Sequence, residues 1–137
     1  MAANTRMATA VQILCVIAYK GAGGTNAEVI SRSLQTNPVV VRRLLKSMEQ
    51  HGLVTIRPGK DGGVQLAREP DTITLDDIYR AVEPEPEVFA LRPIDNPKCP
   101  VDIRMKGLLG PIFRAADSAV QQTLNQTTLS TLVRAIS

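Results

Sequence analysis

Aromatic side chains are scarce in this chain of 137 residues, which has two tyrosines, two phenylalanines and no tryptophan. Proteins that grip single-stranded DNA or RNA by stacking need aromatic platforms on which successive bases lie. Rings this few and this scattered along the chain do not form such a platform. The composition therefore argues against a stacking nucleic-acid binder.

Cysteine and histidine are equally scarce. Cys15 and Cys99 make no disulfide framework, and Cys15 lies on an apolar helical face, where a small buried hydrophobic residue is the simplest interpretation. A thiol enzyme that pairs Cys99 with the single histidine, His51, is an alternative with little support. No nucleophile motif surrounds Cys99, and His51 follows a helix whose C-terminal dipole explains it. We therefore expect that the protein is not an enzyme.

Long hydrophobic runs are missing as well, since no stretch approaches the roughly 20 apolar residues of a membrane span. Arg6 and the apolar run after it could imitate a signal peptide, but Thr9 and Gln12 interrupt the run and no clear cleavage site follows. The sequence therefore predicts a cytoplasmic protein with no membrane contact. The spacing of the apolar residues favours an amphipathic core helix instead. The residues that repeat at helical spacing are Met7, Ala10, Val11, Leu14 and Ala18.

The net charge of +3 hides an uneven distribution. Residues 37–68 carry six basic side chains against two acidic ones, whereas residues 69–137 carry seven basic against ten acidic. Positive charge gathered on one segment is typical of a face that meets a polyanion.

The densest basic segment reads NPVVVRRLLKSMEQH and is closed by Gly52. Asn37 suits the N-cap of a helix, Pro38 its first position, and Gly52 its end. Helical spacing puts an apolar stripe on one side of this helix, formed by Val41, Leu44, Leu45 and Met48. The other side mixes small apolar residues with cations, as the major groove of DNA accepts. We interpret this segment as a recognition helix.

A helix over residues 4–20 and a shorter one up to Ser33 are predicted before it. The first ends at Gly21–Gly24, and Thr25 with Glu28 reads as the capping box of the second. Two short helices joined by a tight turn, the second of them basic, are the helix-turn-helix pattern.

Two β-rich stretches follow, at residues 53–57 and 64–67, with PGKDGG between them. Alternation and turn residues predict a β-hairpin, which in this place would be a wing. A nucleotide-binding glycine loop is disfavoured, because neither GxGxxG nor GxxxxGK[ST] is present.

A third region alternates helix and loop. Thr74 caps a short helix, residues 84–99 hold several prolines and are expected to form an ordered loop, and a stripe from residue 100 to 125 predicts a helix of roughly 39 Å. Gly110-Pro111 suggests a kink or break in this helix, and Thr127-Thr128 can cap a last helix.

The apolar stripe over residues 100–125 is longer than a small domain can cover, so a symmetric homodimer is expected. The predicted dimerisation residues are Val101, Met105, Leu108, Ile112, Ala116, Ala119 and Val120.

Together these motifs resemble the Rrf-two family of bacterial winged helix-turn-helix transcription regulators. The resemblance covers nearly the whole chain and rests on VVVRRLLKSMEQHGLV, RPGKDGGVQLA, TLDDIYRAVE, a cysteine loop and TTLSTLV. It implies a winged-helix domain, dimerisation through the long C-terminal helix, and binding to palindromic double-stranded promoter DNA, most often as a repressor.

Carried over by position, the resemblance implies that the recognition helix faces the major groove, with Lys46 nearer the backbone. Arg57 or Lys60 would reach the minor groove or phosphates, and the wing glycines would shape the backbone. Asp61 stands where the family has a third glycine, so which of the two cations reaches DNA stays open. The predicted DNA-binding residues are Thr25, Asn37, Val39, Val40, Arg42, Arg43, Lys46, Arg57, Lys60, Gly62 and Gly63.

The cysteine loop departs from the family's cluster-binding members, which carry three cysteines there. In this chain the loop reads DNPKCPVDIRM and contains only Cys99. Because an iron–sulfur cluster generally needs four protein ligands, we expect no cofactor. The chain then resembles the cluster-free branch of the family. Lys98 and a helix N-terminus beside Cys99 would stabilise a thiolate, so a redox switch is one hypothesis and a structural role the other. The signal would be an oxidant or an unidentified small effector bound between the wing domain and the long helix.

We therefore predict a mainly α fold with a small β-hairpin (α+β), in three parts. Residues 1–83 form the winged helix-turn-helix DNA-binding domain, 84–99 a Pro-rich sensor loop, and 100–137 the dimerisation helix with a terminal short helix. The predicted function is a dimeric DNA-binding transcription regulator. The alternative is a winged helix that binds another protein without specific DNA binding.

Overall fold

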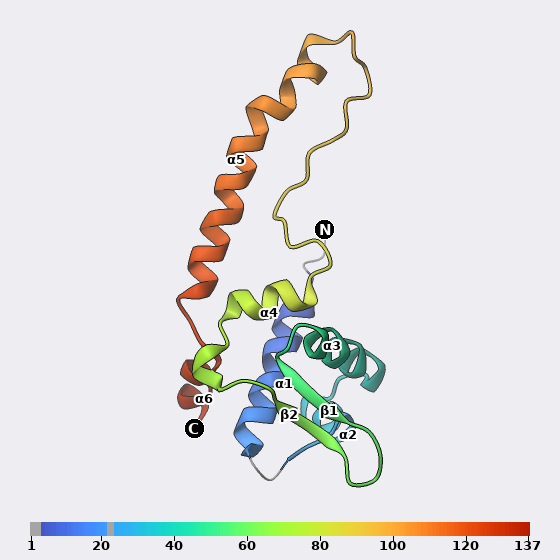
Figure 1. Cartoon of the computed structure of the whole chain (residues 1–137), viewed down its shortest axis with the longest axis vertical. Helices are drawn as coiled ribbons and strands as arrows, with labels where there is room; N and C mark the ends of the chain where they lie inside the picture. Colours follow the sequence, from blue (N-terminus) through green and yellow to red (C-terminus); the bar gives the residue numbers. More distant parts are fainter. Residues whose placement is uncertain (1–3, 22–23) are drawn as a thin grey trace.

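Three helices lie in the first fifty residues, and the second and third form the predicted helix-turn-helix (Figure 1). The computed structural model describes residues 4–21 and 24–137, and places α1 at Arg6–Lys20, α2 at Ala27–Leu34 and α3 at Pro38–Gln50. Residues 22–23 of the predicted glycine turn lie outside the described residues. The caps of α3 are those expected: Asn37 Oδ1 accepts the Val39 N–H at 2.8 Å, and Gly52 has φ 74°.

The cap predicted for α2 is wrong by one residue. Asn26, and not Thr25, is the N-cap, and its side chain accepts the Val29 N–H at 2.9 Å. Thr25 instead forms an antiparallel bridge with Val64, whose N–H donates to the Thr25 carbonyl at 2.8 Å. Pairing with the hairpin holds Thr25 extended, so the helix starts after it.

The hairpin joins β1 (Val54–Arg57) to β2 (Gly63–Leu66), with Val54 opposite Leu66 and Arg57 opposite Gly63. Val54 and Val64 are buried and attach the hairpin to the core. Two main-chain segments approach each other closely where the hairpin loop ends. A Cβ added to Gly62 would lie only 1.9 Å from the Arg57 carbonyl oxygen. This position requires glycine.

One core joins the helix-turn-helix, the hairpin and the two short helices α4 (Leu75–Val82) and α6 (Leu129–Ile136). The predicted cap of α4 is confirmed as a reciprocal box between Thr74 and Asp77. A turn of 3₁₀ helix, η2 (Pro70–Thr72), precedes it, and α6 packs against both η2 and α1. The Leu129 N–H donates to the Ile73 carbonyl at 2.8 Å. The terminal helix therefore lies on the winged unit.

The long helix α5 (Pro100–Asn125) extends away from this unit as an arm (Figure 1). It runs through Gly110-Pro111 as one helix of 26 residues, so of the expected kink or break the break does not occur. Pro111 removes the bond to the carbonyl four residues earlier, which belongs to Gly107. Gly107 is exposed, and water can donate a hydrogen bond to its freed carbonyl oxygen there.

The loop of residues 84–99 leads from α4 to the start of α5 and packs along one side of that helix. Phe89 and Phe113 stack with ring centroids 5.3 Å apart, and Asp117 Oδ1 accepts the Val88 N–H at 2.8 Å. The loop leaves another side of α5 uncovered. The side chains exposed there are Val101, Leu108 and Ile112, at 65%, 61% and 62%. None of the helices in the described ranges is both long and apolar enough to cross a membrane.

Candidate nucleic-acid interface

The candidate recognition helix α3 has one buried side and one exposed side. Val41, Leu44, Leu45 and Met48 are buried, at 3% exposure or less, which confirms the helix phase predicted from the spacing. Val39 is 55% exposed, and Arg42, Arg43 and Lys46 are exposed. The helix therefore offers a cationic face held by a rigid core.

Two residues predicted to face DNA are placed differently. Val40 is half-buried and packs against the core cluster, so only part of it is available outside. Asn37 is exposed, but its side-chain oxygen is already used by the Val39 N–H. Both would shape the start of the interface more than they would read bases.

Arg42 has a partner that the sequence analysis missed. Its guanidinium lies 3.6 Å from a carboxylate oxygen of Glu28 on α2, with both side chains more than half exposed. An exposed pair of this kind contributes roughly 0–1 kcal/mol. Its effect is to bias where Arg42 points, because one end of the arginine is held beside α2.

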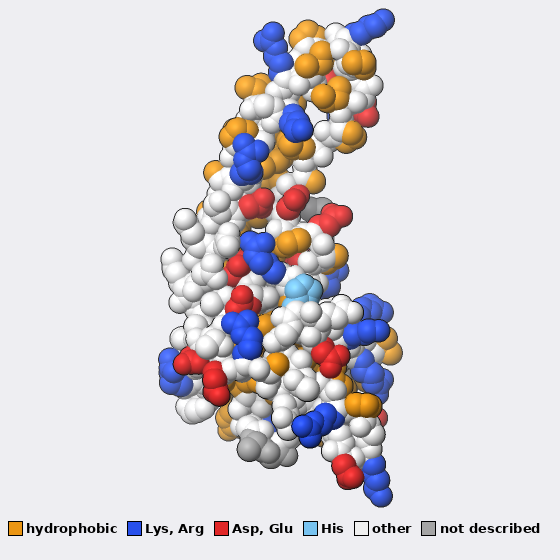
Figure 2. Space-filling model, viewed as in Figure 1, with side chains coloured by type: hydrophobic (Ala, Val, Ile, Leu, Met, Phe, Trp, Pro, Cys, Tyr) orange, Lys and Arg blue, Asp and Glu red, His pale blue; other side chains and the backbone are white. Residues whose placement is uncertain are grey.

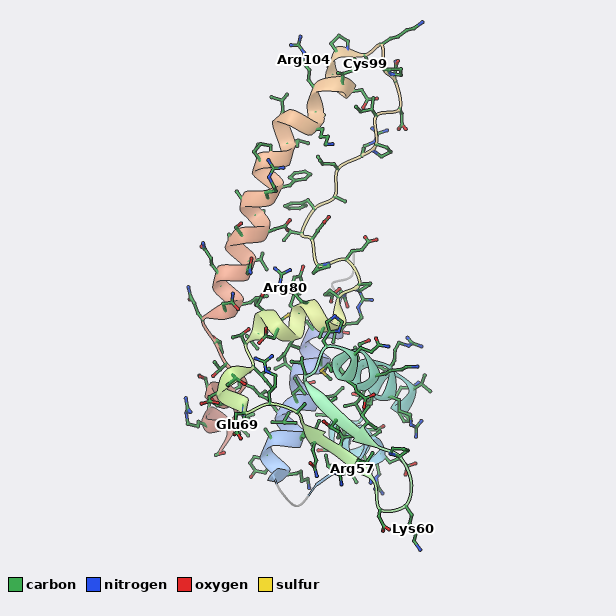
Figure 3. All side chains as sticks on the ribbon, viewed as in Figure 1. Arg57, Lys60, Glu69, Arg80, Cys99 and Arg104 are labelled. Atoms are coloured by element: carbon green, nitrogen blue, oxygen red, sulfur yellow. The ribbon has the colours of Figure 1, made fainter. Side chains whose placement is uncertain are left out.

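The wing is fixed to α3 and carries its two cations outward. The Ile56 N–H donates to Glu49 Oε2 at 3.0 Å, which ties β1 to α3. Arg57 and Lys60 are exposed, and Lys60 projects from the tip of the loop (Figure 3).

The wing glycines act within the protein. Gly62 permits the close turn described above, and a Cβ on Gly63 would lie 2.6 Å from the Thr25 carbonyl oxygen. The Thr25 hydroxyl is itself buried, with no hydrogen-bond partner among the described residues. The predicted DNA role of Thr25 therefore does not fit this conformation of its side chain.

These cations share one edge of the winged unit. Figure 2 shows Lys and Arg side chains along the edge formed by α3 and continuing to the tip of the wing. The exposed members are Arg42, Arg43, Lys46, Arg57 and Lys60. A groove of about 600 Å³ is lined by Arg42, Arg57 and Lys60, and it runs from the start of α2 past Arg42 to the wing loop. An exposed helix beside an open groove and a basic loop suits a nucleic-acid duplex.

Comparison with known proteins decides the family. The Rrf2 family model, described as an iron-dependent transcriptional regulator, matches residues 3–135. The chain belongs to the Rrf2 (Rrf-two) family of transcriptional regulators. Bacillus subtilis YwnA, named a candidate HTH-type transcriptional regulator, is 36% identical over 121 residues, covering 88% of this chain and 89% of YwnA.

Solved structures agree on the fold of this Rrf2 protein. A crystal structure named as that of a candidate DNA-binding protein has TM-score 0.74 and 32% identity, over 93% of this chain and 97% of that one. CymR of B. subtilis, named the global cysteine regulator, has TM-score 0.69 and 23% identity, over 98% and 97% of the two chains. IscR of T. potens has TM-score 0.72 and 20% identity, over 100% and 89%. The winged helix and the α+β class are thereby confirmed.

The donor set of this Rrf2 chain does not fit an iron site. Among the described residues, no three His, Cys, Asp or Glu side chains gather as metal ligands would. Cys15 is buried in α1, where burial raises the pKa of its thiol, and the His51 ring nitrogen Nδ1 bonds the Ser47 carbonyl at 2.9 Å. In the described part of the chain, no such group of side chains therefore includes Cys99.

Cys99 lies at the N-cap of α5 and is half-buried beside a groove of about 900 Å³ between the loop and α5. This groove is on the arm, not between the wing and α5 where the sequence-based hypothesis placed an effector. The effector site and the redox role of Cys99 stay predictions.

Proposed function

We propose that this Rrf2 protein is a homodimer that binds an inverted repeat in promoter DNA and represses transcription. The observation that carries the proposal is the exposed basic face of α3 beside a basic wing, on a helix whose opposite side is locked in the core. In the proposed division of labour, residues 1–83 bind DNA, 84–99 sense a signal and 100–137 dimerise. Because α6 packs against α1 and η2, we expect the last helix also to stabilise the proposed DNA-binding unit.

The dimer is supported by the uncovered side of α5. Val101, Leu108 and Ile112 lie in a row and are each more than 60% exposed. Large apolar side chains aligned on one helix face indicate a partner surface. Two copies related by a twofold axis would present two α3 helices, as a palindromic operator requires.

The direct test is selection of bound fragments from sheared genomic DNA of the source organism. Recovery of a few promoter fragments that share an inverted repeat is the expected result, with affinity that falls steeply as salt rises. A protein-interaction module would recover no fragments above background. Repression is then tested by placing a recovered promoter before a reporter gene, with and without the protein.

Arg42→Ala is expected to weaken binding to the selected site by about 1–3 kcal/mol and to relax the choice of base at one position of each half-site. The reason is that Arg42 projects from the exposed face near the start of α3. Titrations against a panel of single-base operator variants measure this. Equal losses on every variant would contradict base reading by Arg42.

Lys46→Ala is the matched change one turn further along the same face. A phosphate contact carries no base information, so we expect a uniform loss on all operator variants and a shallower dependence of affinity on salt. The slope of log affinity against log salt is the measurement. An unchanged slope would remove Lys46 from the interface.

Cys99→Ser tests the redox hypothesis. If Cys99 is a switch, mild oxidation releases the parent protein from its operator and leaves the Ser variant bound, because a hydroxyl cannot follow thiol oxidation. Operator affinity is measured before and after hydrogen peroxide treatment. Equal behaviour of the two proteins would assign Cys99 a structural role.

A further inference from the structure

A third groove lies on the winged unit itself, where α6 packs against α1. Figure 1 shows α6 on one side of α1 and α3 on the other. The groove has a volume of about 600 Å³ and shares no lining residue with the groove beside Arg42 or with the groove on the arm. We call it the α1–α6 groove. Its lining comes from α1 between Val11 and Lys20, from α6 between Leu132 and Ile136, and from Ser33 and Leu34 at the end of α2.

The floor of the α1–α6 groove is apolar. Val11, Val16 and Leu132 line it, and each is partly buried against the core. The Cys15 thiol also lines the groove, and burial raises the pKa of this thiol, so it stays uncharged at neutral pH. An uncharged buried cysteine behaves as a small hydrophobic residue. The floor therefore suits a hydrocarbon chain.

Two large side chains on the rim of the groove are unusually exposed. Tyr19 of α1 is 63% exposed and Ile136 of α6 is 60% exposed, although both line the groove above the core. Exposed apolar side chains beside an apolar groove indicate a binding surface. Their position on two different helices makes this surface concave, as a small-molecule site requires.

One cation stands at the edge of this apolar groove. Among the described residues that line it, Lys20 is the one charged side chain. Lys20 is exposed in the last turn of α1, and none of the ion pairs within the described ranges includes it. The groove therefore complements a ligand with an apolar body and one negative charge. A lone lysine suits a carboxylate, whereas a phosphate is usually held by arginine or by several donors together.

Helical spacing gives the length of the ligand. Val11, Cys15 and Tyr19 follow one another at intervals of four residues, and Val16 and Lys20 form a neighbouring row. The distance along the helix axis from Val11 to Tyr19 is roughly 12 Å. An extended chain covers about 1.2 Å per bond, so about ten carbons reach from one end of the groove to the other.

We propose that the α1–α6 groove binds a medium-chain fatty acid, with its unbranched chain along α1 and its carboxylate at Lys20. The site gives this transcriptional regulator a place for a small ligand that is apart from the basic face of α3 and from the arm. It goes beyond the proposed binding of operator DNA and does not depend on it.

Calorimetric titration of the full-length protein with decanoate, kept below the concentration at which it forms micelles, tests the proposal. One site per chain is expected. Each buried methylene raises affinity roughly fourfold, so hexanoate is expected to bind at least tenfold more weakly than decanoate. 1-Decanol has the same chain without the charge, and it is expected to bind more weakly because Lys20 then has no anion to meet.

Filling the groove is the second arm of the test. Ala135 is exposed and lines the groove, so Ala135→Phe puts a ring where the chain would lie without disturbing the core. Decanoate affinity is expected to fall at least tenfold. Arg134→Phe is the matched control, because it adds the same ring at an exposed residue that is outside the lining, and it leaves decanoate binding unchanged. Thermal melts followed by circular dichroism show that both variants are folded.

Lys20→Gln tests the position of the carboxylate. Decanoate affinity is expected to fall roughly threefold to fivefold, as for an exposed charge pair, while 1-decanol affinity stays unchanged. A merely structural role of Lys20 would change both affinities alike. Arg32→Gln removes an exposed cation of α2 that does not line the groove, and it is expected to leave both affinities unchanged.

The absence of saturable decanoate binding overturns the proposal. Binding that Ala135→Phe does not weaken also overturns it, since the ligand then lies elsewhere, for example on the apolar row of Val101, Leu108 and Ile112. Equal losses for decanoate and 1-decanol in Lys20→Gln overturn the assigned place of the carboxylate. Selection of operator fragments is scored separately, so a failed groove site leaves the DNA-binding proposal standing.

Discussion

An aspartate in place of Val41 is expected to leave the chain largely unfolded at room temperature. Val41 is fully buried, within the core cluster that joins α3 to the other helices. A carboxylate placed there has no cation or donor to meet, which costs several kcal/mol even if it takes up a proton. That cost is comparable to the whole stability of a small domain, about 5–15 kcal/mol. Thermal unfolding followed by circular dichroism measures it.

Val39→Asp is the matched control, with the same chemical change two residues earlier in the same helix. Val39 is 55% exposed, so this protein is expected to melt as the parent does. It should nevertheless lose operator binding, since its carboxylate would face the phosphates of the duplex. If Val41→Asp melted like the parent and Val39→Asp unfolded, the orientation of α3 would be wrong.

Gly62→Ala is expected to destabilise the wing by roughly 3 kcal/mol, at the upper end of what overpacking costs. An added Cβ would lie 1.9 Å from the Arg57 carbonyl oxygen and 2.8 Å from that of Pro58, and main chain cannot move aside as a side chain can. The hairpin end must open, which displaces Arg57 and Lys60 and weakens DNA binding. Hydrogen exchange of the β1 and β2 amides and the operator affinity are the two measurements.

Gly107→Ala provides the contrast for that substitution. Nothing lies within 4 Å of a Cβ added at Gly107, and alanine favours a helix over glycine by about 0.5–1 kcal/mol. We expect a small rise in the unfolding temperature and no change in wing protection. Faster exchange of the hairpin in both variants would show that the Gly62 effect is not local.

Local signals in the sequence predict the elements that local interactions build. Asn37, Pro38 and Gly52 mark the ends of α3 because their capping contacts lie within a few residues of them. The box between Thr74 and Asp77 is local in the same way. Apolar spacing then gives the buried side of α3, because the helical period alone decides which side chains point together.

The errors arise where distant segments meet. Thr25 is drawn out of its cap by Val64, nearly forty residues later in the chain. The contact between Arg42 and Glu28 depends on how α2 and α3 cross, which no spacing rule gives. The expectation of a kink or break at Pro111 follows the general cost of proline in a helix, and the exposed setting of Gly107 removes part of that cost.

The packing of α6 on α1 has a consequence for how the protein is made. Leu129, from the last helix, and Leu14, from the first, belong to the same core, and both are fully buried. During synthesis the N-terminal part leaves the ribosome first, so the part of α1 that packs against α6 stays uncovered until residues 129–136 have been made. The winged unit is therefore completed only after α6 has been made, and a chain that stopped before α6 would expose apolar side chains of α1.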